Sequence, residues 1–217
     1  MAPTGVFLVN SGITAKDTLD LETFTRWYED IHIPDLLTTS GIHTAYRFQA
    51  APASPKPSAV VTARPFLALY PLENTAWAAD DNSEMWKVPI VHDMLPNESK
   101  NVFELAEFQM GLYVKLGSVG GGGCTPAKNV VVVSIDPMEV DSRAGSDLEG
   151  LLRDSITVDG GDAPVPVRST LFKWAYAPPD IPTPADVAPG TSMIASFLAI
   201  VSAVFWGCVI GTGLTFC

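Results

Sequence analysis

The residues best suited to acid–base chemistry lie in the segment FTRWYEDIHIPDLL, which begins at Phe24. Within it, Tyr28, His32 and Asp35 stand four and three residues apart, so they share one face of a helix. An imidazole between a phenol and a carboxylate is a credible general acid or base, because its ordinary pKa lies near neutrality and the carboxylate can orient its tautomer. The other interpretation of this pattern is a packing histidine that hydrogen-bonds a strand carbonyl.

A second group of polar side chains lies on the strand expected over 42–49. His43 and Arg47 fall on one side of such a strand, whereas Tyr46 and Phe48 fall on the other and are expected to face the core. If the polar side lines a cavity, Arg47 can hold a carboxylate or a phenolate. Otherwise it is an ordinary solvated charge.

No complete set of metal ligands is visible in the sequence. His32 and Asp35 supply two candidates, but no HExxH motif or cysteine pair completes them, and His92 is expected in a loop after the second helix. The cysteines are too few and too scattered for a disulfide framework, which favours a reducing compartment. The cysteines are Cys124, Cys208 and Cys217. Because neither the histidines nor the cysteines complete a set of ligands, we expect no metal site.

The charge balance argues against a nucleic-acid partner. The 217 residues include 13 Lys and Arg against 24 Asp and Glu, a formal net charge of −11. Nucleic-acid binders need a basic face, because phosphate neutralisation supplies most of their non-specific affinity. The length suits one domain or two small ones, each able to bury a core.

Hydrophobic periodicity in residues 1–119 predicts the order strand, helix, strand, strand, helix, strand. The expected strands cover 5–10, 42–49, 60–70 and 102–119, and the expected helices cover 19–37 and about 74–91. Asp20 is the expected N-cap of the first helix, and Pro34 is expected to kink or tighten it. This order is that of the ferredoxin-like motif, an α+β fold in which an antiparallel sheet carries both helices on one face.

The pattern begins again after a glycine run. Residues 120–127 are interpreted as a flexible linker, because no GK[ST] follows the four glycines that would make a phosphate-binding loop. A strand over 129–136, a helix over 146–155 and a strand over 167–175 then give a partial second half over 128–176. Two such halves can lay their sheets face to face, although the repeat stops at the proline-rich linker 177–192. A second chain, or a different tail, would be needed to complete it.

The tail is apolar, since Val187 to Cys217 contains no charged residue. Residues 193–216 would reach across a hydrocarbon layer of ~30 Å at ~1.5 Å per helical residue, so a transmembrane helix is expected. Without a recognisable signal peptide, the soluble part is expected in the cytoplasm, with the tail as an anchor in an intracellular membrane. A buried core helix and a tail altered by an incorrect gene model are the alternatives.

The sequence W-Y-x-x-x-H-I-P-D-L-L followed by G-I-x-x-A-x-R-F resembles the first helix and second strand of EthD-type proteins in the dimeric α+β barrel superfamily, especially fungal ones. The specific part runs from Phe24 to Phe48, and the element order extends the resemblance over about 5–189. The resemblance implies two ferredoxin-like units that form a barrel, either within one chain or in a homodimer of this chain. The interior of such barrels binds small hydrophobic or aromatic molecules, and the family histidine corresponds to His32.

From this we expect a cofactor-free isomerase, cyclase, dehydratase or decarboxylase of secondary metabolism that acts on a polyketide-like molecule. His32 would transfer the proton, with Tyr28 and Asp35 positioning it, since no flavin, nicotinamide or haem motif is visible. The residues expected to contact the substrate are Trp27, His43, Arg47 and Trp86. The alternatives are a non-catalytic module for ligand binding or dimerisation, and a module tethered to a membrane by its tail.

Overall fold

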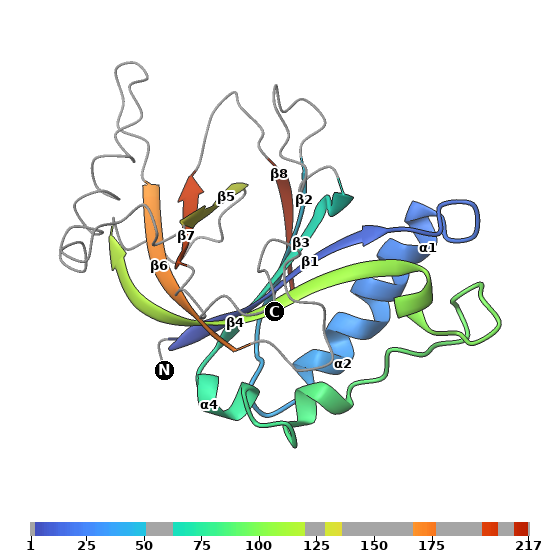
Figure 1. Cartoon of the computed structure of the whole chain (residues 1–217), viewed down its shortest axis with the longest axis horizontal. Helices are drawn as coiled ribbons and strands as arrows, with labels where there is room; N and C mark the ends of the chain where they lie inside the picture. Colours follow the sequence, from blue (N-terminus) through green and yellow to red (C-terminus); the bar gives the residue numbers. More distant parts are fainter. Residues whose placement is uncertain are drawn as a thin grey trace, which may run out of the picture.

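The fold is a mixed α+β fold built on an antiparallel sheet (Figure 1). The computed structural model describes residues 3–50, 63–119, 129–135, 167–176, 197–203 and 211–216. In this part of the chain the strands lie in the order β5-β7-β6-β4-β1-β3-β2-β8. They are β1 (Gly5–Ile13), β2 (Ala45–Ala50), β3 (Phe66–Leu72), β4 (Ala106–Val119), β5 (Asn129–Ile135), β6 (Val167–Tyr176), β7 (Phe197–Ala203) and β8 (Gly211–Phe216).

Strand β1 is central to the first part of the chain and is buried on both faces. It pairs with β3 and with β4, so that Leu8 lies opposite Leu69 on one side and Gly111 on the other. Phe7 and Val9 belong to the larger apolar cluster, beneath the helices, while Leu8 belongs to a smaller cluster on the other face. Burial on both faces explains why residues 5–9 of this strand form a continuous apolar run instead of alternating.

The first helix covers one face of the sheet and runs without a break from Leu21 to Leu37. It consists of α1 (Leu21–Arg26), the π-helical turn η1 (Trp27–His32) and α2 (Ile33–Leu37). The expected N-cap is confirmed, because the Asp20 side chain accepts a hydrogen bond of 2.7 Å from the backbone N–H of Thr23.

The helix widens before Pro34, where a kink or a tightening was expected. The backbone N–H of Ile33 donates to the carbonyl of Tyr28, five residues back. In a regular α-helix the Pro34 ring would crowd the Asp30 carbonyl and leave it without a donor. A π-turn just before the proline is a known way to absorb such a break in the hydrogen-bond ladder.

The prediction of a second long helix over 74–91 is wrong. The chain forms only the short α4 (Thr75–Ala78) and, after a turn, the 3₁₀ helix η2 (Glu84–Lys87). The Asn74 side chain caps α4 by accepting from the backbone N–H of Ala76, but the Asp80 carboxylate then accepts a hydrogen bond of 2.8 Å from the backbone N–H of Asn82. That local bond competes with continuation of the helix.

The strand expected over 102–119 begins later, at Ala106. A 3₁₀ turn, η3 (Val102–Glu104), precedes it, and the Asn101 side chain caps that turn by accepting from the Phe103 N–H. The strands expected over 5–10 and 42–49 correspond to β1 and β2. Those over 129–136 and 167–175 correspond to β5 and β6.

The tail differs from the expected helix over 193–216, because its described residues are strands. β7 lies between β5 and β6, and β8 pairs with β2. The β-branched and aromatic residues of these segments favour strand, and the glycines of β8 disfavour helix. Within the described residues, no helix is long and apolar enough to cross a membrane.

Several expected features lie outside the described residues. They are the linkers 120–127 and 177–192, the helix expected over 146–155, residues 60–62 of the third expected strand, and Cys124, Cys208 and Cys217.

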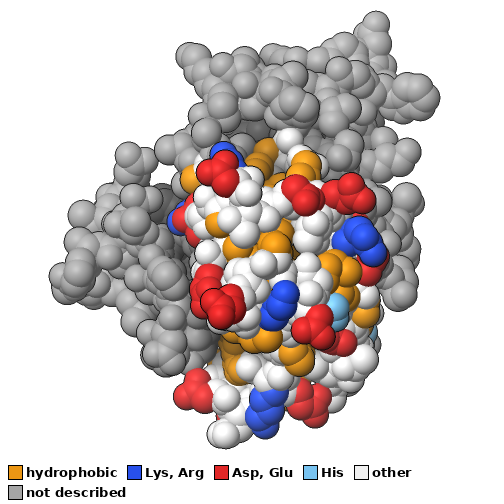
Figure 2. Space-filling model, turned by 90° about the vertical axis from the view of Figure 1, so that its right-hand side faces the viewer, with side chains coloured by type: hydrophobic (Ala, Val, Ile, Leu, Met, Phe, Trp, Pro, Cys, Tyr) orange, Lys and Arg blue, Asp and Glu red, His pale blue; other side chains and the backbone are white. Residues whose placement is uncertain are grey.

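On the face seen in Figure 2, the charged side chains of the described residues are dispersed, and the basic ones stand apart from one another.

Candidate ligand site beneath the first helix

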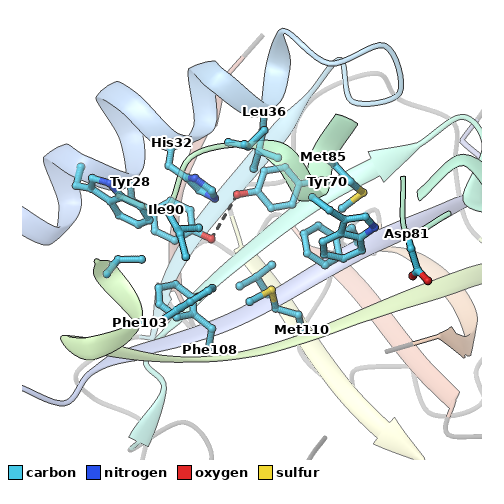
Figure 3. A pocket seen from close by; sticks show the side chains of 16 residues that line it. Tyr28, His32, Leu36, Tyr70, Asp81, Met85, Ile90, Phe103, Phe108 and Met110 are labelled. Carbon is cyan, nitrogen blue, oxygen red and sulfur yellow. Dashed lines mark hydrogen bonds between the residues drawn. The ribbon is translucent and has the colours of Figure 1, made fainter. Parts of the chain in front are cut away.

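A cavity of about 500 Å³ lies between the first helix and the sheet (Figure 3). Strands β1, β3 and β4 form its floor, and the segments around η2 and η3 close its sides. Its volume falls in the range of about 300–1,000 Å³ that is usual for small-molecule sites. Aromatic rings dominate its wall, among them Phe7, Trp27, Tyr28, Tyr70, Trp86 and Phe108.

His32 reaches this cavity because of the π-turn. Its ring stacks on that of Trp27, five residues earlier, with centroids 4.9 Å apart and planes inclined by 15°. In an α-helix, residues five apart point about 140° away from each other, at about 100° per residue. The i→i+5 bonds of a π-turn bring them onto the same side. Both of these residues therefore line the cavity.

The tautomer of His32 follows from its hydrogen bonds. The ring bonds to the backbone of Pro89, and a proline backbone offers only a carbonyl, so the ring donates. Nδ1 is buried and has no hydrogen-bond partner. The donor is therefore Nε2, and Nδ1 carries a lone pair that no protein group uses.

Burial lowers the pKa of His32 from 6.5 to about 4, against a smaller opposing effect of the hydrogen bond with Pro89. The imidazole is therefore neutral at pH 7, since a cation would lose its hydration in this apolar site. In this form it can accept a hydrogen bond or a proton at Nδ1.

Two tyrosine hydroxyls meet beside the imidazole. The Tyr70 hydroxyl donates to that of Tyr28 over 3.3 Å, and the Tyr28 ring stands edge-on to that of His32 with centroids 5.5 Å apart. Burial raises the pKa of Tyr28, opposed by the Tyr70 hydrogen bond and by the charge of Arg47. Burial, with a contribution from Tyr28, raises the pKa of Tyr70 well above its ordinary value. Both side chains are protonated, and the Tyr28 proton remains for a further acceptor.

The segment opposite the helix is held by hydrogen bonds to neighbouring elements. The Glu84 carboxylate accepts a bond of 2.8 Å from the backbone N–H of Ser40, which joins η2 to the end of α2. The Trp86 indole donates over 3.0 Å to the carbonyl of Ala78 at the end of α4. These bonds fix the wall that carries Met85 and Trp86.

Asp35 does not take the position expected for it. It is absent from the cavity wall, where Leu36 follows His32 instead, and no hydrogen bond reaches Nδ1. The π-turn changes the phase of the helix, so the four-and-three spacing no longer places Asp35 beside the imidazole. A carboxylate therefore does not orient His32, and the Pro89 carbonyl takes that part.

Arg47 and His43 also lie away from the cavity. Arg47 is buried on the helix side of β2, ion-paired with Glu29, and His43 is exposed. Phe48 packs instead in the smaller cluster on the opposite face, with Tyr46 against it. Arg47 therefore does not line this cavity, and its buried ion pair with Glu29 also rules out the alternative of a solvated charge. Because both faces of the sheet are covered, alternation alone could not tell which side meets the helix.

Trp27 and Trp86, which the sequence predicts as substrate contacts, both line the cavity. Tyr70 and Asp81 line it as well, although sequence reasoning gave neither a role. The signal for Tyr70 was its place in strand alternation with Phe66 and Ala68, since a buried tyrosine usually needs a partner for its hydroxyl.

The described residues contain no group of three His, Cys, Asp or Glu side chains that could hold a metal ion.

Comparison with known protein families, curated proteins and solved structures gives no match for the chain.

Proposed function

We propose that the protein binds a small hydrophobic or aromatic molecule in this cavity and that His32 moves a proton on it. The observation that carries the proposal is the unpartnered Nδ1 of a neutral imidazole, placed with two tyrosine hydroxyls in an aromatic wall. A group that is uncharged at pH 7 and shielded from water is suited to accept a proton from a bound substrate.

The reaction class that fits best is a cofactor-free isomerisation, cyclisation, dehydration or decarboxylation of a polyketide-like compound. Nδ1 of His32 would take a proton, and the Tyr28 hydroxyl would donate a hydrogen bond to the oxygen on which negative charge develops. Tyr70 would support Tyr28 by donating to it. Each role uses a residue that lines the cavity.

We also infer that residues 1–119 form the first ferredoxin-like half of an EthD-type α+β barrel. The order β4-β1-β3-β2 of the central strands supports this, as does the helix packed on one face. The end strands β5 and β8 of the described sheet approach each other, with Cα atoms within 8 Å, which supports closure of a barrel.

A non-catalytic ligand-binding protein is the second candidate. The pKa of about 4 favours it, because an imidazole with so low a pKa is a weak base. Turnover separates the two functions. Wild type and His32→Gln would be incubated with a panel of aromatic β-polyketones and the products followed by mass spectrometry, with His43→Gln as the matched control. Catalysis predicts loss of product formation in the His32 variant alone, whereas ligand binding without turnover in wild type supports the second candidate.

Occupation of the cavity is tested separately with naphthalene derivatives by calorimetry. Met110→Trp would fill the cavity from β4, whereas Leu116→Trp, on the same strand, changes a side chain that is 51% exposed. Binding should be lost in the first variant and kept in the second. Equal binding by both would place the ligand elsewhere.

A further inference from the structure

The cavity is poor in charge. Asp81 is the only lining residue in the described part of the chain with a formal charge at pH 7, and it is exposed. Figure 3 shows it at the opposite end of the cavity from His32. The buried guanidinium of Arg47 is outside the wall and already paired with Glu29. An anionic ligand would lose its hydration here without meeting a cation, which is costly.

The buried end offers one acceptor and one donor close together. The acceptor is Nδ1 of His32, which no protein group satisfies. The donor is the Tyr28 hydroxyl, which accepts from Tyr70 and so keeps its own proton for a ligand. A carbonyl or an ether can use the donor only. A hydroxyl can use both.

We propose that the ligand is a neutral planar molecule whose aromatic or enolic hydroxyl donates to Nδ1 of His32 and accepts from Tyr28. This rests on the proposed function and adds the charge and the polar group of the compound. Nδ1 has no contact with bulk water, so the neighbouring side chains must move slightly to admit the hydroxyl. A planar skeleton fits between the rings of the wall, where stacked and edge-on contacts are favourable.

The hydroxyl keeps its proton in the resting complex. Burial makes the His32 imidazole a weaker base than it is in water, and a phenol is a weak acid, so the neutral pair is favoured. The bound form is therefore a hydrogen-bonded phenol or enol beside a neutral imidazole, with no ion pair.

Four probes with one skeleton test this by isothermal titration calorimetry at pH 7. 2-Naphthol can donate and accept, 2-methoxynaphthalene can only accept, 2-naphthoate is an anion, and 2-(aminomethyl)naphthalene is a cation. We expect 2-naphthol to bind about five- to tenfold more tightly than the methyl ether, as one neutral hydrogen bond allows. The two charged probes should bind more weakly than the ether.

The variants His32→Phe and His43→Phe complete the test. Replacement of His32 should reduce the preference for 2-naphthol over its ether to about onefold, while the exposed His43 variant keeps it. If His32→Phe does not fold, the order of the four probes on the wild-type protein still decides. Tighter binding of the naphthoate or of the amine would overturn the proposal.

The same experiment distinguishes a failure of this proposal from a failure of the proposed function on which it rests. If all four probes bind equally and Met110→Trp abolishes their binding, the cavity is a ligand site but does not select a hydroxyl. If none binds to the wild-type protein, both the proposed function and the present inference fail.

Discussion

The guanidinium carbon of Arg47 lies 4.8 Å from the centre of the Tyr28 ring. The same guanidinium pairs with Glu29, the next residue after Tyr28, so one arginine on β2 holds the π-turn against the sheet. Arg47 is 6% exposed and Glu29 is 15% exposed, and the rings of Phe24 and Phe66 also lie near the cation. The position of Tyr28 in the cavity therefore depends on an ion pair outside it.

Breaking this pair should destabilise the protein strongly. Arg47→Met leaves the Glu29 carboxylate largely buried without its partner, and we expect a loss of about 3 kcal/mol in the free energy of unfolding by urea denaturation. The double variant Arg47→Met with Glu29→Gln should recover part of that loss. The control is Arg26→Met, which removes a pair with Asp30 whose side chains are 60% and 65% exposed, and should change stability by less than about 0.5 kcal/mol. Equal effects of the two single variants would contradict the importance of the buried pair.

The buried imidazole should make the fold sensitive to acid. Because the pKa of His32 is about 4 in the folded protein and 6.5 when unperturbed, the unfolded chain binds the extra proton first as the pH falls. The stability linked to His32 is complete above pH 6.5 and decreases between about 6.5 and 4, by roughly 3 kcal/mol. The unfolding free energy of His32→Asn, measured from pH 8 to pH 4, should decrease less over this interval than that of wild type. A parallel decrease in the two proteins would show that this histidine is not buried as described. His43→Asn should behave like wild type.

The pH dependence of turnover should also differ from that of an exposed histidine. If Nδ1 of His32 is the base, kcat/KM of the free enzyme should be nearly flat between about pH 5 and 8 and decrease only toward pH 4. A flat profile over that interval is therefore compatible with His32 catalysis. An inflection near pH 6.5 that persists in His43→Gln would indicate another catalytic group.

The two tyrosines should contribute unequally to turnover. Tyr28→Phe removes the donor to the developing oxyanion and should lower kcat about a hundredfold. Tyr70→Phe removes only the hydroxyl that supports Tyr28, and a reduction of about tenfold or less is expected, as for the loss of one neutral hydrogen bond. Tyr46→Phe, on the opposite face of the sheet, is the control. A larger loss in Tyr70→Phe than in Tyr28→Phe would reverse the roles.

Local sequence signals predicted part of this structure. Asp20 and the hydrophobic periodicity located the start of the first helix and most strands of the sheet in the described residues. These features depend on neighbours a few residues away, which is why a sequence pattern can reveal them. The prediction of a long second helix was wrong because the Asp80 carboxylate accepts a local hydrogen bond from the Asn82 N–H, which competes with continuation of the helix. Hydrophobic periodicity gives no information about such a bond.

The site itself was predicted only in part. His32, Tyr28, Trp27 and Trp86 were expected and do line one cavity. The predicted position of Asp35 was wrong because the spacing argument assumed the regular hydrogen-bond ladder of an α-helix. The predicted position of Arg47 was wrong because both faces of the sheet are apolar. The partnership of Tyr28 with Tyr70 joins residues 42 positions apart in the chain, so only the pairing of the strands could reveal it.

Pro34 is exposed and lies outside the cavity wall, yet the wide turn that stacks Trp27 on His32 ends just before it. An alanine there would restore a donor for the Asp30 carbonyl and allow the ladder to tighten. If the cavity binds a ligand as proposed, a substitution at this exposed position would alter binding without touching the ligand. In a homologue, replacement of this proline would therefore predict altered ligand binding even where every residue of the cavity wall is the same.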